Sequence, residues 1–205
     1  MKLYQNRQAP NPRRARMFMS EKGVDFDAIE IVELDLSAGD NISAEHKHRN
    51  PMGGVPVLEL DDGTYLSESM AISRYYEALH PEPPLMGVGA LEQATIEMWN
   101  RRMELNFFMP VGMAFRHTSG HFSDREAVCP EWGEITLKGA RKMFSFLNNH
   151  LANNEYIAGE SFSVADITAL CTVDFARVIK LRIDDEQPHL RRWYDTVSAR
   201  PSAGA

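Results

Sequence analysis

The chain has 205 residues, which is enough for one large domain or two small ones with buried cores. Its net charge of −7 leaves no broad basic surface to neutralise phosphates, so we do not expect nucleic acid as a partner. No run approaches the roughly 20 apolar residues that span a bilayer, and the first residues, MKLYQNRQAP, lack the apolar segment of a signal peptide. We therefore expect a cytoplasmic protein without a membrane partner.

The first part of the chain predicts a β-strand, a helix and a second strand. Lys2–Gln5 is typical of a short strand. Asn11 is a strong N-cap and Pro12 suits the first helical position, so a helix should begin there and end at Gly23. Residues 26–36 mix apolar and acidic side chains and are expected to form the second strand. Together these elements predict a βαβ unit with parallel strands and a right-handed crossover.

Residues 50–69, NPMGGVPVLELDDGTYLSES, predict a turn, a hairpin and the start of a helix in direct succession. Val55–Leu60 alternates like a half-buried strand, and Asp61–Gly63 can close a hairpin onto the residues that follow. A helix should then begin at Ser67–Ser69, because serines suit N-cap positions and apolar residues recur at helical spacing as far as Leu79. This hairpin and helix complete the predicted first domain.

Two features of this segment point to a small-molecule site. Pro56 cannot donate to a strand ladder, so the bond between Val55 and Pro56 should lie at a sheet edge or be cis. Either arrangement leaves the N–H and C=O of Val55 free to pair with an extended peptide. The start of the next helix offers N–H groups and the Ser69 hydroxyl to a carboxylate, while Glu68 could hold an amine. The alternative is a plain hairpin followed by a capped helix.

A proline-rich segment marks the clearest boundary in the chain. His80-Pro-Glu-Pro-Pro contains three prolines in four residues, which cannot continue a helix and form a stiff extended linker. We therefore expect one domain at residues 1–80, a linker at residues 81–87 and a second domain at residues 88–205.

The second domain should be entirely helical. Pro110 is expected to kink or split its first long helix, and residues 202–205 should form a frayed tail. Ser163-Val-Ala-Asp166 matches a capping box, in which Ser163 caps a helix and Asp166 reaches back. The helix that it opens is apolar on most sides and should be the core helix of this domain. Helical patterns extend over residues 91–117, 132–151, 164–179 and 190–197.

Metal, nucleotide and redox chemistry have no support in the sequence. Cys129 and Cys171 belong to no C-x-x-C pair or zinc spacing, and neither lies near the first helix, where a thiol–disulfide enzyme needs its nucleophile. His117 and His121 lack a Glu or Cys that would complete a metal site, and the two histidines of residues 46–48 are expected in a solvated loop. No G-x-G-x-x-G motif or phosphate loop is present.

The segments NPxGxVPVLELDDG and ESxAIxRY, in this order and spacing, resemble the glutathione-binding half of the glutathione S-transferases. The resemblance covers nearly the whole chain and implies a thioredoxin-like α/β domain followed by an all-α domain. It implies that Val55, before a cis-proline at Pro56, pairs with the cysteinyl backbone of glutathione. It also implies that Glu68 and Ser69 hold the γ-glutamyl group and that Asn41 reaches the glycine end.

The resemblance leaves the activation of the thiol open. Members of the family attack electrophiles with the glutathione thiolate, and related enzymes favour it with a Tyr, Ser or Cys near the first helix. Residues 5–16 contain none of these, and Tyr4 lies inside the first predicted strand. Asn11 could donate to the sulfur, or it could serve only as the N-cap. The three arginines of residues 13–16 oppose the helix dipole, so they either lower the thiol pKa or form a solvated face.

The segments APNPRR, WNRR and FRHT resemble an atypical bacterial and fungal branch of the family, related to yeast Gtt2. In that branch thiolate formation is ascribed to the helix N-terminus and to a water held by a His and a Ser of the helical domain. The matching histidine is His117, with Ser119 or Ser123 as the serine; the alternative is a surface histidine. Counting back from His117 by helical steps gives a strip that could line an electrophile pocket or belong to the core. Its members are Met113, Pro110, Asn106 and Met103.

We therefore predict a homodimeric glutathione S-transferase that acts in detoxification, with glutathione as co-substrate, a hydrophobic electrophile and no metal. The absence of Tyr, Ser and Cys near the first helix motivates one alternative, a catalytically weak glutathione-binding protein. A glutathione-dependent isomerase or dehalogenase is another alternative, because the pocket residues are generic and a fold does not fix a reaction.

Overall fold

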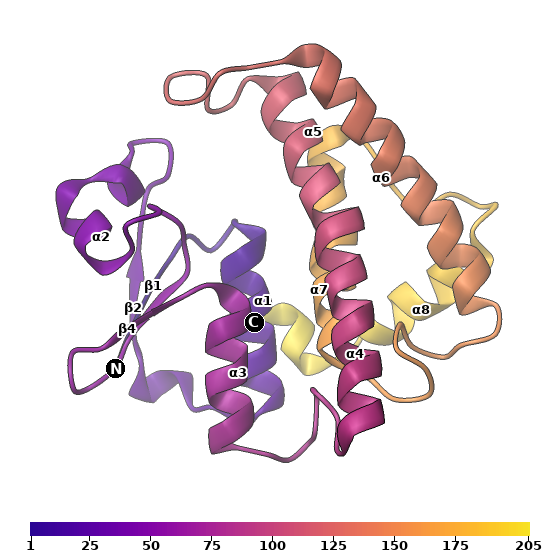
Figure 1. Ribbon diagram of the computed structural model, residues 1–205, viewed down its shortest axis with the longest axis horizontal. Helices are drawn as coiled ribbons and strands as arrows, with labels where there is room; N and C mark the ends of the chain where they lie inside the picture. Colours follow the sequence, from indigo (N-terminus) through magenta and orange to yellow (C-terminus); the bar gives the residue numbers. More distant parts are fainter. The chain divides into compact units, whose positions relative to one another are not determined.

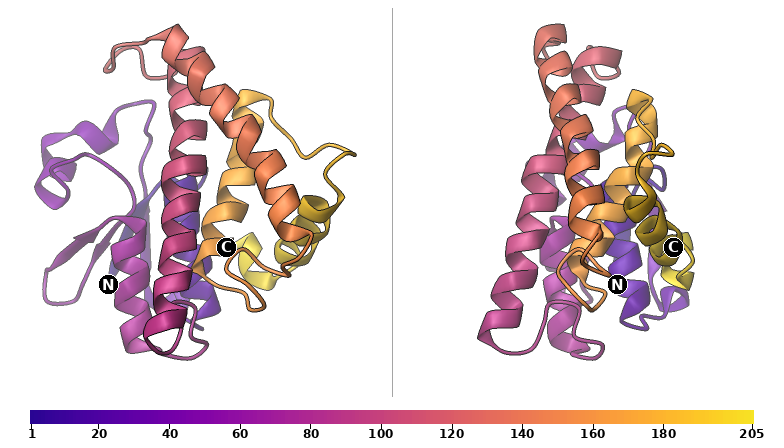
Figure 2. Two further views of the ribbon diagram at one scale, coloured as in Figure 1. Left: turned by 45° about the vertical axis from the view of Figure 1, so that its right-hand side comes forward. Right: turned by 90° about the vertical axis from the view of Figure 1, so that its right-hand side faces the viewer.

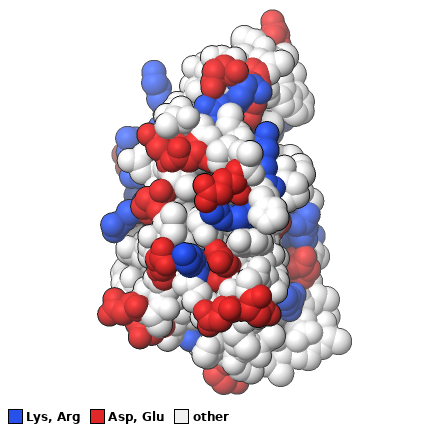
Figure 3. All heavy atoms as spheres, turned by 90° about the vertical axis from the view of Figure 1, so that its left-hand side faces the viewer, with Lys and Arg blue, Asp and Glu red and all other residues white.

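The computed structural model describes residues 1–205 and divides into two compact units (Figure 1). The first comprises residues 1–84 with 201–205 and is an α/β unit, whereas the second comprises residues 85–200 and is all-helical. These two classes confirm the predicted fold class. None of the helices combines the length and the apolar character that a membrane crossing requires. On the face drawn in Figure 3, acidic and basic side chains are interspersed and no basic patch forms.

The first unit is built on a four-stranded sheet with the order β2-β1-β3-β4. The strands are β1 (Lys2–Gln5), β2 (Glu30–Glu33), β3 (Val57–Glu59) and β4 (Tyr65–Ser67). β1 pairs with β2 in parallel and with β3 in antiparallel, and β3 and β4 form the predicted hairpin. The second strand is shorter than expected, because Phe26–Ala28 forms a 3-10 turn that the Asp25 carboxylate caps.

Helices α1 (Pro10–Glu21) and α3 (Ser69–Leu79) pack against each other beside this sheet, as Figure 1 shows. The start of α1 differs from the prediction: Ala9 is the N-cap, and Pro10 takes the first helical position. Because the chain has prolines at both 10 and 12, the sequence allowed two starting points. Fully buried side chains of this unit include Leu3, Met17, Phe18, Leu58, Ile72 and Tyr76.

A buried lysine fixes the proline-rich segment to the first unit. The Lys22 side chain is fully buried, and its ammonium lies 2.5 Å from Oε2 of Glu77 at the end of α3. It also donates to the backbone carbonyls of Pro81 and Pro83. The segment therefore packs on the first unit, and the boundary between the units falls after Pro84.

The last residues also belong to the first unit. Pro201–Gly204 forms a 3-10 turn in which Ser202 is buried. Arg13 of α1 donates to the Ala203 carbonyl at 3.0 Å, and the Ser202 hydroxyl donates to Glu21. The prediction of a frayed tail is therefore wrong, because these residues are held by contacts with α1, which lies far from them in the sequence.

The second unit contains α4 (Ala90–Met103), α5 (Met109–Ser119), α6 (Pro130–Leu151), α7 (Val164–Phe175) and α8 (Pro188–Ser198). Pro110 is expected to kink or split this helix, but α4 and α5 form one continuous rod (Figure 2), so it does not split into two, and the α-helix is interrupted only by a π-helical turn. A π-helical turn, Glu104–Phe108, precedes the proline, and Met109 donates to the Glu104 carbonyl five residues back. This wider turn accommodates a residue that lacks an N–H.

The capping box at the start of α7 is present as predicted. The Ser163 hydroxyl accepts from the Ala165 N–H, and the Asp166 carboxylate accepts from the Ser163 N–H at 2.9 Å. Every residue from Val164 to Val173 is buried, so α7 is the core helix of the second unit.

Candidate functional site

The loop before β3 presents an unpaired backbone segment. The peptide bond between Val55 and Pro56 is cis, which is one of the two predicted arrangements. Pro56 is buried, and neither the N–H nor the C=O of Val55 takes part in a hydrogen bond within the protein. An extended ligand could pair with both groups as an added strand.

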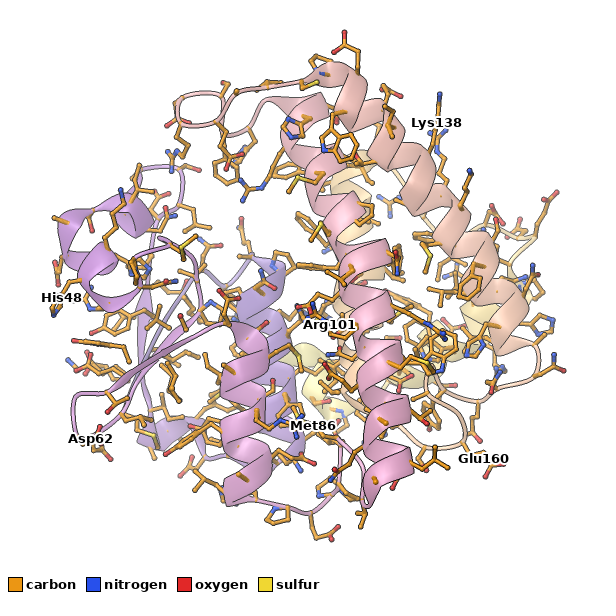
Figure 4. The ribbon with its side chains drawn as sticks, viewed as in Figure 1. His48, Asp62, Met86, Arg101, Lys138 and Glu160 are labelled. Atoms are coloured by element: carbon orange, nitrogen blue, oxygen red, sulfur yellow. The ribbon has the colours of Figure 1, made fainter.

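The carbonyl of Gly54, directly before this segment, is held by two side chains. Nε2 of His46 and Nδ2 of Asn50 both lie 3.0 Å from the Gly54 oxygen. His46 is 1% exposed, so its expected place in a solvated loop is wrong. The short helix α2 (Ala44–Arg49), which Ser43 caps, turns His46 inward, while His48 is exposed (Figure 4) and its ring lies 6.2 Å from that of Tyr65. These two contacts with the Gly54 carbonyl therefore fix the backbone that leads into Val55.

Asn41 supports the same loop. Its Nδ2 donates to the Gly53 carbonyl at 2.7 Å, and its Oδ1 is buried. Gly53 has φ of 66°, and a Cβ there would lie 3.0 Å from the Asn41 carbonyl oxygen, so this close approach requires glycine. The Asn41 amide nitrogen thus positions the loop, and the direct contact with the glycine end of glutathione that the resemblance implies stays a prediction.

The start of α3 is open to a ligand. Glu68, the N-cap, has φ of 71° and ψ of 121°, a conformation that non-glycine residues rarely adopt and that often marks a binding site. Ser69 is 4% exposed, and its hydroxyl makes no hydrogen bond within the protein. No side chain caps α3, so the expectation that its serines do so is wrong. The unpaired N–H groups and the positive end of the helix dipole favour an anion here.

The hairpin brings the two features to the same end of the sheet. Val57 of β3 pairs with Ser67 of β4 in antiparallel register. Val55 precedes Val57 and Ser69 follows Ser67, so both leave the hairpin at this end. A ligand with a carboxylate at one end and a peptide backbone can therefore contact both.

Asn11 does not cap α1, because it is the second residue of the helix. Its side chain is half-buried, and its Oδ1 accepts from Nη1 of Arg14 at 3.2 Å. Its Nδ2 donates to no acceptor within the protein, so the amide can donate to a ligand. This removes the interpretation of Asn11 as an N-cap.

The arginines of residues 13–16 do not form a solvated face. Arg14 and Arg16 are 3% and 7% exposed. The Arg16 guanidinium donates to Oε1 of Gln5 and to the carbonyls of Arg7 and Ala205, so it joins α1 to the end of β1 and to the tail. Arg16 therefore has a structural role.

Tyr4 is not available to activate a thiol. Its hydroxyl donates to Oε2 of Glu59 at 2.6 Å. Burial, followed by this hydrogen bond, raises the pKa of Tyr4 to about 12. The phenol therefore keeps its proton at neutral pH, in agreement with its predicted place inside β1.

In the second unit, His117 lies in the last turn of α5 and is half-buried. Its Nδ1 accepts from the backbone N–H of Cys129 at 3.2 Å. The Ser119 hydroxyl donates to the Phe115 carbonyl at 2.6 Å and accepts from the His121 N–H at 3.1 Å. The Ser119 hydroxyl is therefore already hydrogen-bonded at the C-terminal end of α5, whereas Ser123 is exposed.

The residues of the predicted pocket strip differ widely in exposure. Met103 is fully buried in the core, Asn106 is exposed, and Pro110 and Met113 are half-buried. The π-helical turn shifts the residues after Met103 relative to those before it, so counting by α-helical steps fails there. Met103 is therefore a core residue and not a pocket residue.

The structure contains an aromatic cluster near His117 that the sequence pattern did not predict. The Phe115 ring lies 5.6 Å from that of Phe175 and 6.4 Å from that of Phe122. Arg116 and Arg125 lie over the Phe122 ring at 4.9 and 5.5 Å, which holds the loop between α5 and α6. These contacts join separate elements, so periodicity within one helix could not reveal them.

Comparison with known proteins decides the family. Models of the N-terminal and C-terminal domains of glutathione S-transferases match residues 1–77 and 131–201. The chain belongs to the glutathione S-transferase family. Glutathione S-transferase 2 of Saccharomyces cerevisiae is 35% identical over 204 residues, which cover 98% of this chain and 87% of that relative.

Two solved structures of glutathione S-transferases are similar over almost the whole chain. The crystal structure of Gtt2 from Saccharomyces cerevisiae has a TM-score of 0.91 at 34% identity and covers 100% of this chain and 99% of its own. A glutathione S-transferase domain-containing protein from Marinobacter aquaeolei has a TM-score of 0.91 at 36% identity, with coverages of 98% and 99%. These matches confirm the resemblance to the branch of yeast Gtt2.

The family member described here carries its candidate residues in separate units. Val55, Glu68, Ser69 and Asn11 belong to the first unit, and His117 belongs to the second. Residues 5–16 of the chain contain no Tyr, Ser or Cys. Any activation of a thiol must therefore use other groups.

Proposed function

We propose that this chain is a glutathione transferase that converts the glutathione thiol to a thiolate and adds it to an electrophilic carbon of apolar small molecules. Detoxification in the cytoplasm is the role that fits this chemistry. One observation carries the proposal: the unpaired backbone of Val55 and the uncapped start of α3 lie at the same end of the hairpin.

Glutathione fits these groups along its length. Its γ-glutamyl carboxylate would accept from the Ser69 hydroxyl and the first N–H groups of α3, and its ammonium would face the Glu68 carboxylate. Its cysteinyl N–H and C=O would pair with the C=O and N–H of Val55. This arrangement binds the peptide by charge at one end and by backbone pairing in the middle.

The thiol would be activated by hydrogen-bond donors and by the dipole of α1. A free thiol has a pKa of about 8.5, and each unit of lowering requires about 1.4 kcal/mol of preference for the thiolate. The positive end of α1, which has no acidic residue in its first turn, and Nδ2 of Asn11 favour a nearby anion. We propose His117 as a further donor from the second unit, acting through a water.

A titration of bound glutathione tests binding and activation together. Following the ultraviolet absorbance of the thiolate against pH, we expect the thiol pKa to be about 1–2 units below the free value. Asn11→Ala and His117→Ala should each raise it by about half a unit to one unit. An unshifted thiol in the bound state would favour the glutathione-binding protein, and absence of binding would contradict both functions.

Homodimer formation is part of the proposal. Four exposed apolar side chains lie along the rod of α4 and α5, two of them before the π-helical turn, one within it and one directly after it. They are Leu91, Met98, Leu105 and Met109. We propose that these side chains pack on the first domain of a second subunit, which would cover their apolar surface.

We expect the double variant Met98→Glu/Leu105→Glu to elute as a monomer, because two charges would then be buried at the interface. Size-exclusion chromatography with light scattering measures the mass directly. Ile135→Glu, which changes an exposed apolar residue of α6, is the control and should remain dimeric. A dimeric double variant would contradict this interface.

A further inference from the structure

The residue directly before α6 is hydrogen-bonded to His117 and is itself held by the first turn of that helix. Nδ1 of His117 accepts from the Cys129 N–H at 3.2 Å. The Cys129 carbonyl accepts from the Gly133 N–H at 3.1 Å, so the same turn holds Cys129 in place. The backbone of α6 is therefore linked directly to the imidazole.

Gly133 permits the helices to approach closely at this point. A Cβ at Gly133 would lie 2.8 Å from Cγ2 of Thr118 and 3.0 Å from the backbone carbon of His117. The Thr118 side chain cannot turn away freely, because its hydroxyl donates to the Ala114 carbonyl at 2.7 Å. Any larger residue at position 133 must therefore push α6 away from His117.

Gly139, one and a half turns further along α6, provides a contrast. A Cβ there would lie 4.0 Å from Cβ of Pro110, which is an ordinary van der Waals contact. The same substitution is therefore harmless to packing at Gly139 and disruptive at Gly133.

The contact with Cys129 also determines the tautomer of His117. A backbone N–H can only donate, so Nδ1 must be the acceptor, and the neutral ring carries its proton on Nε2. Nε2 makes no hydrogen bond within the protein. The ring is thus a donor at its free nitrogen, and a donor stabilises a thiolate whereas an acceptor stabilises a thiol.

We propose that the first turn of α6 is the positioning element for His117: the Cys129 N–H fixes the Nε2–H tautomer, and Gly133 allows the approach that makes this bond. Cys129 and Gly133 are positioning residues, since they act through the imidazole. This inference rests on the proposed function of His117 in activating the thiol.

The first test compares Gly133→Ala with Gly139→Ala. For Gly133→Ala we expect the bound thiol pKa to rise by up to about one unit and kcat to fall by up to about tenfold, because misplacing the imidazole cannot cost more than removing it in His117→Ala. The KM for glutathione should change by less than about threefold, since the glutathione-binding residues lie in the first unit. Gly139→Ala should stay within about twofold of the parent in every quantity. Equal behaviour of the two variants would overturn the inference.

The second test reads the tautomer and does not depend on the folding of Gly133→Ala. Nitrogen-15 NMR of the ring, assigned by its loss in His117→Ala, should show Nδ1 without a proton. His117→Gln places its amide near the position of Nε2, whereas the shorter side chain of His117→Asn places its amide near Nδ1 and leaves no donor at the position of Nε2. We expect His117→Gln to retain at least about threefold more activity than His117→Asn, and the reverse order or a proton on Nδ1 would overturn the inference.

The two levels of the proposal fail in different ways. If His117→Ala leaves the bound thiol pKa and kcat unchanged, the function proposed for His117 is wrong. If His117→Ala impairs both and Gly133→Ala impairs neither, His117 acts in catalysis but the first turn of α6 does not position it.

Discussion

Replacement of Glu68 and Ser69 together by alanine is expected to weaken glutathione binding by about 10²- to 10⁴-fold. A hydrogen bond to a charged group contributes about 1.5–3 kcal/mol, so two such bonds amount to about 3–6 kcal/mol, with a factor of ten for each 1.4 kcal/mol. Ser69 binds the carboxylate and Glu68 the ammonium in the proposed complex. Each single variant should lose about 10- to 100-fold.

The fold should tolerate this double variant. The Glu68 side chain is exposed, and the Ser69 hydroxyl makes no hydrogen bond within the protein, so alanine leaves no internal group without a partner. Isothermal titration calorimetry with glutathione measures the loss. Asp62→Ala removes a carboxylate at the exposed tip of the hairpin in the same unit (Figure 4) and should bind as the parent does. Unaltered binding in the double variant would disprove the site.

Replacement of Asp166 by alanine is expected to lower the free energy of unfolding by about 3–5 kcal/mol. The carboxylate is fully buried and accepts from the Ile157 N–H at 2.9 Å and from the Trp193 indole at 2.8 Å. It also accepts from the N–H and the hydroxyl of Ser163 at 2.9 and 3.1 Å. Alanine would leave several buried donors without a partner, each at a cost of about 1–3 kcal/mol, and would remove half of the capping box.

Urea denaturation followed by tryptophan fluorescence measures this change. Asp174→Ala on the same helix is the matched control, since Asp174 is half-buried and accepts from the Tyr194 hydroxyl at 2.7 Å. We expect it to cost about 1 kcal/mol. Equal losses in the two variants would contradict the role of Asp166 as the central acceptor of the second unit.

The cost of Asp166→Ala should also depend on pH. Burial raises the pKa of Asp166 from 3.8 to about 6, although its four hydrogen bonds favour the carboxylate. Because the folded state binds the proton more tightly than the unfolded state, the stability from this group is fully present below about pH 4 and decreases as the pH rises through about 6. The difference between parent and variant should therefore be larger at pH 5 than at pH 7.5, and a larger difference at pH 7.5 would contradict this sign.

The sequence by itself determined the elements whose signals are local. Turn residues predicted the hairpin after Val55, and the spacing of Ser163 and Asp166 predicted the capping box, because a cap or a turn needs only residues a few positions apart. The order of such signals also indicated the family, since the backbone segment at Val55 and the open start of α3 are one continuous stretch of chain.

The tertiary structure alone decided which side chains meet across the sequence. His46 is buried because Gly54 and the loop cover it, and residues 201–205 are ordered because Arg13 and Glu21 of α1 bind them. Met103 is fully buried in the core, although the helical spacing assigned it to the predicted pocket strip. The hydrogen-bond donor to His117 is the backbone N–H of Cys129, directly before α6. Burial and hydrogen bonding between distant residues depend on packing, which no local pattern encodes, and so the binding segment was predictable whereas the environment of the catalytic candidates was not.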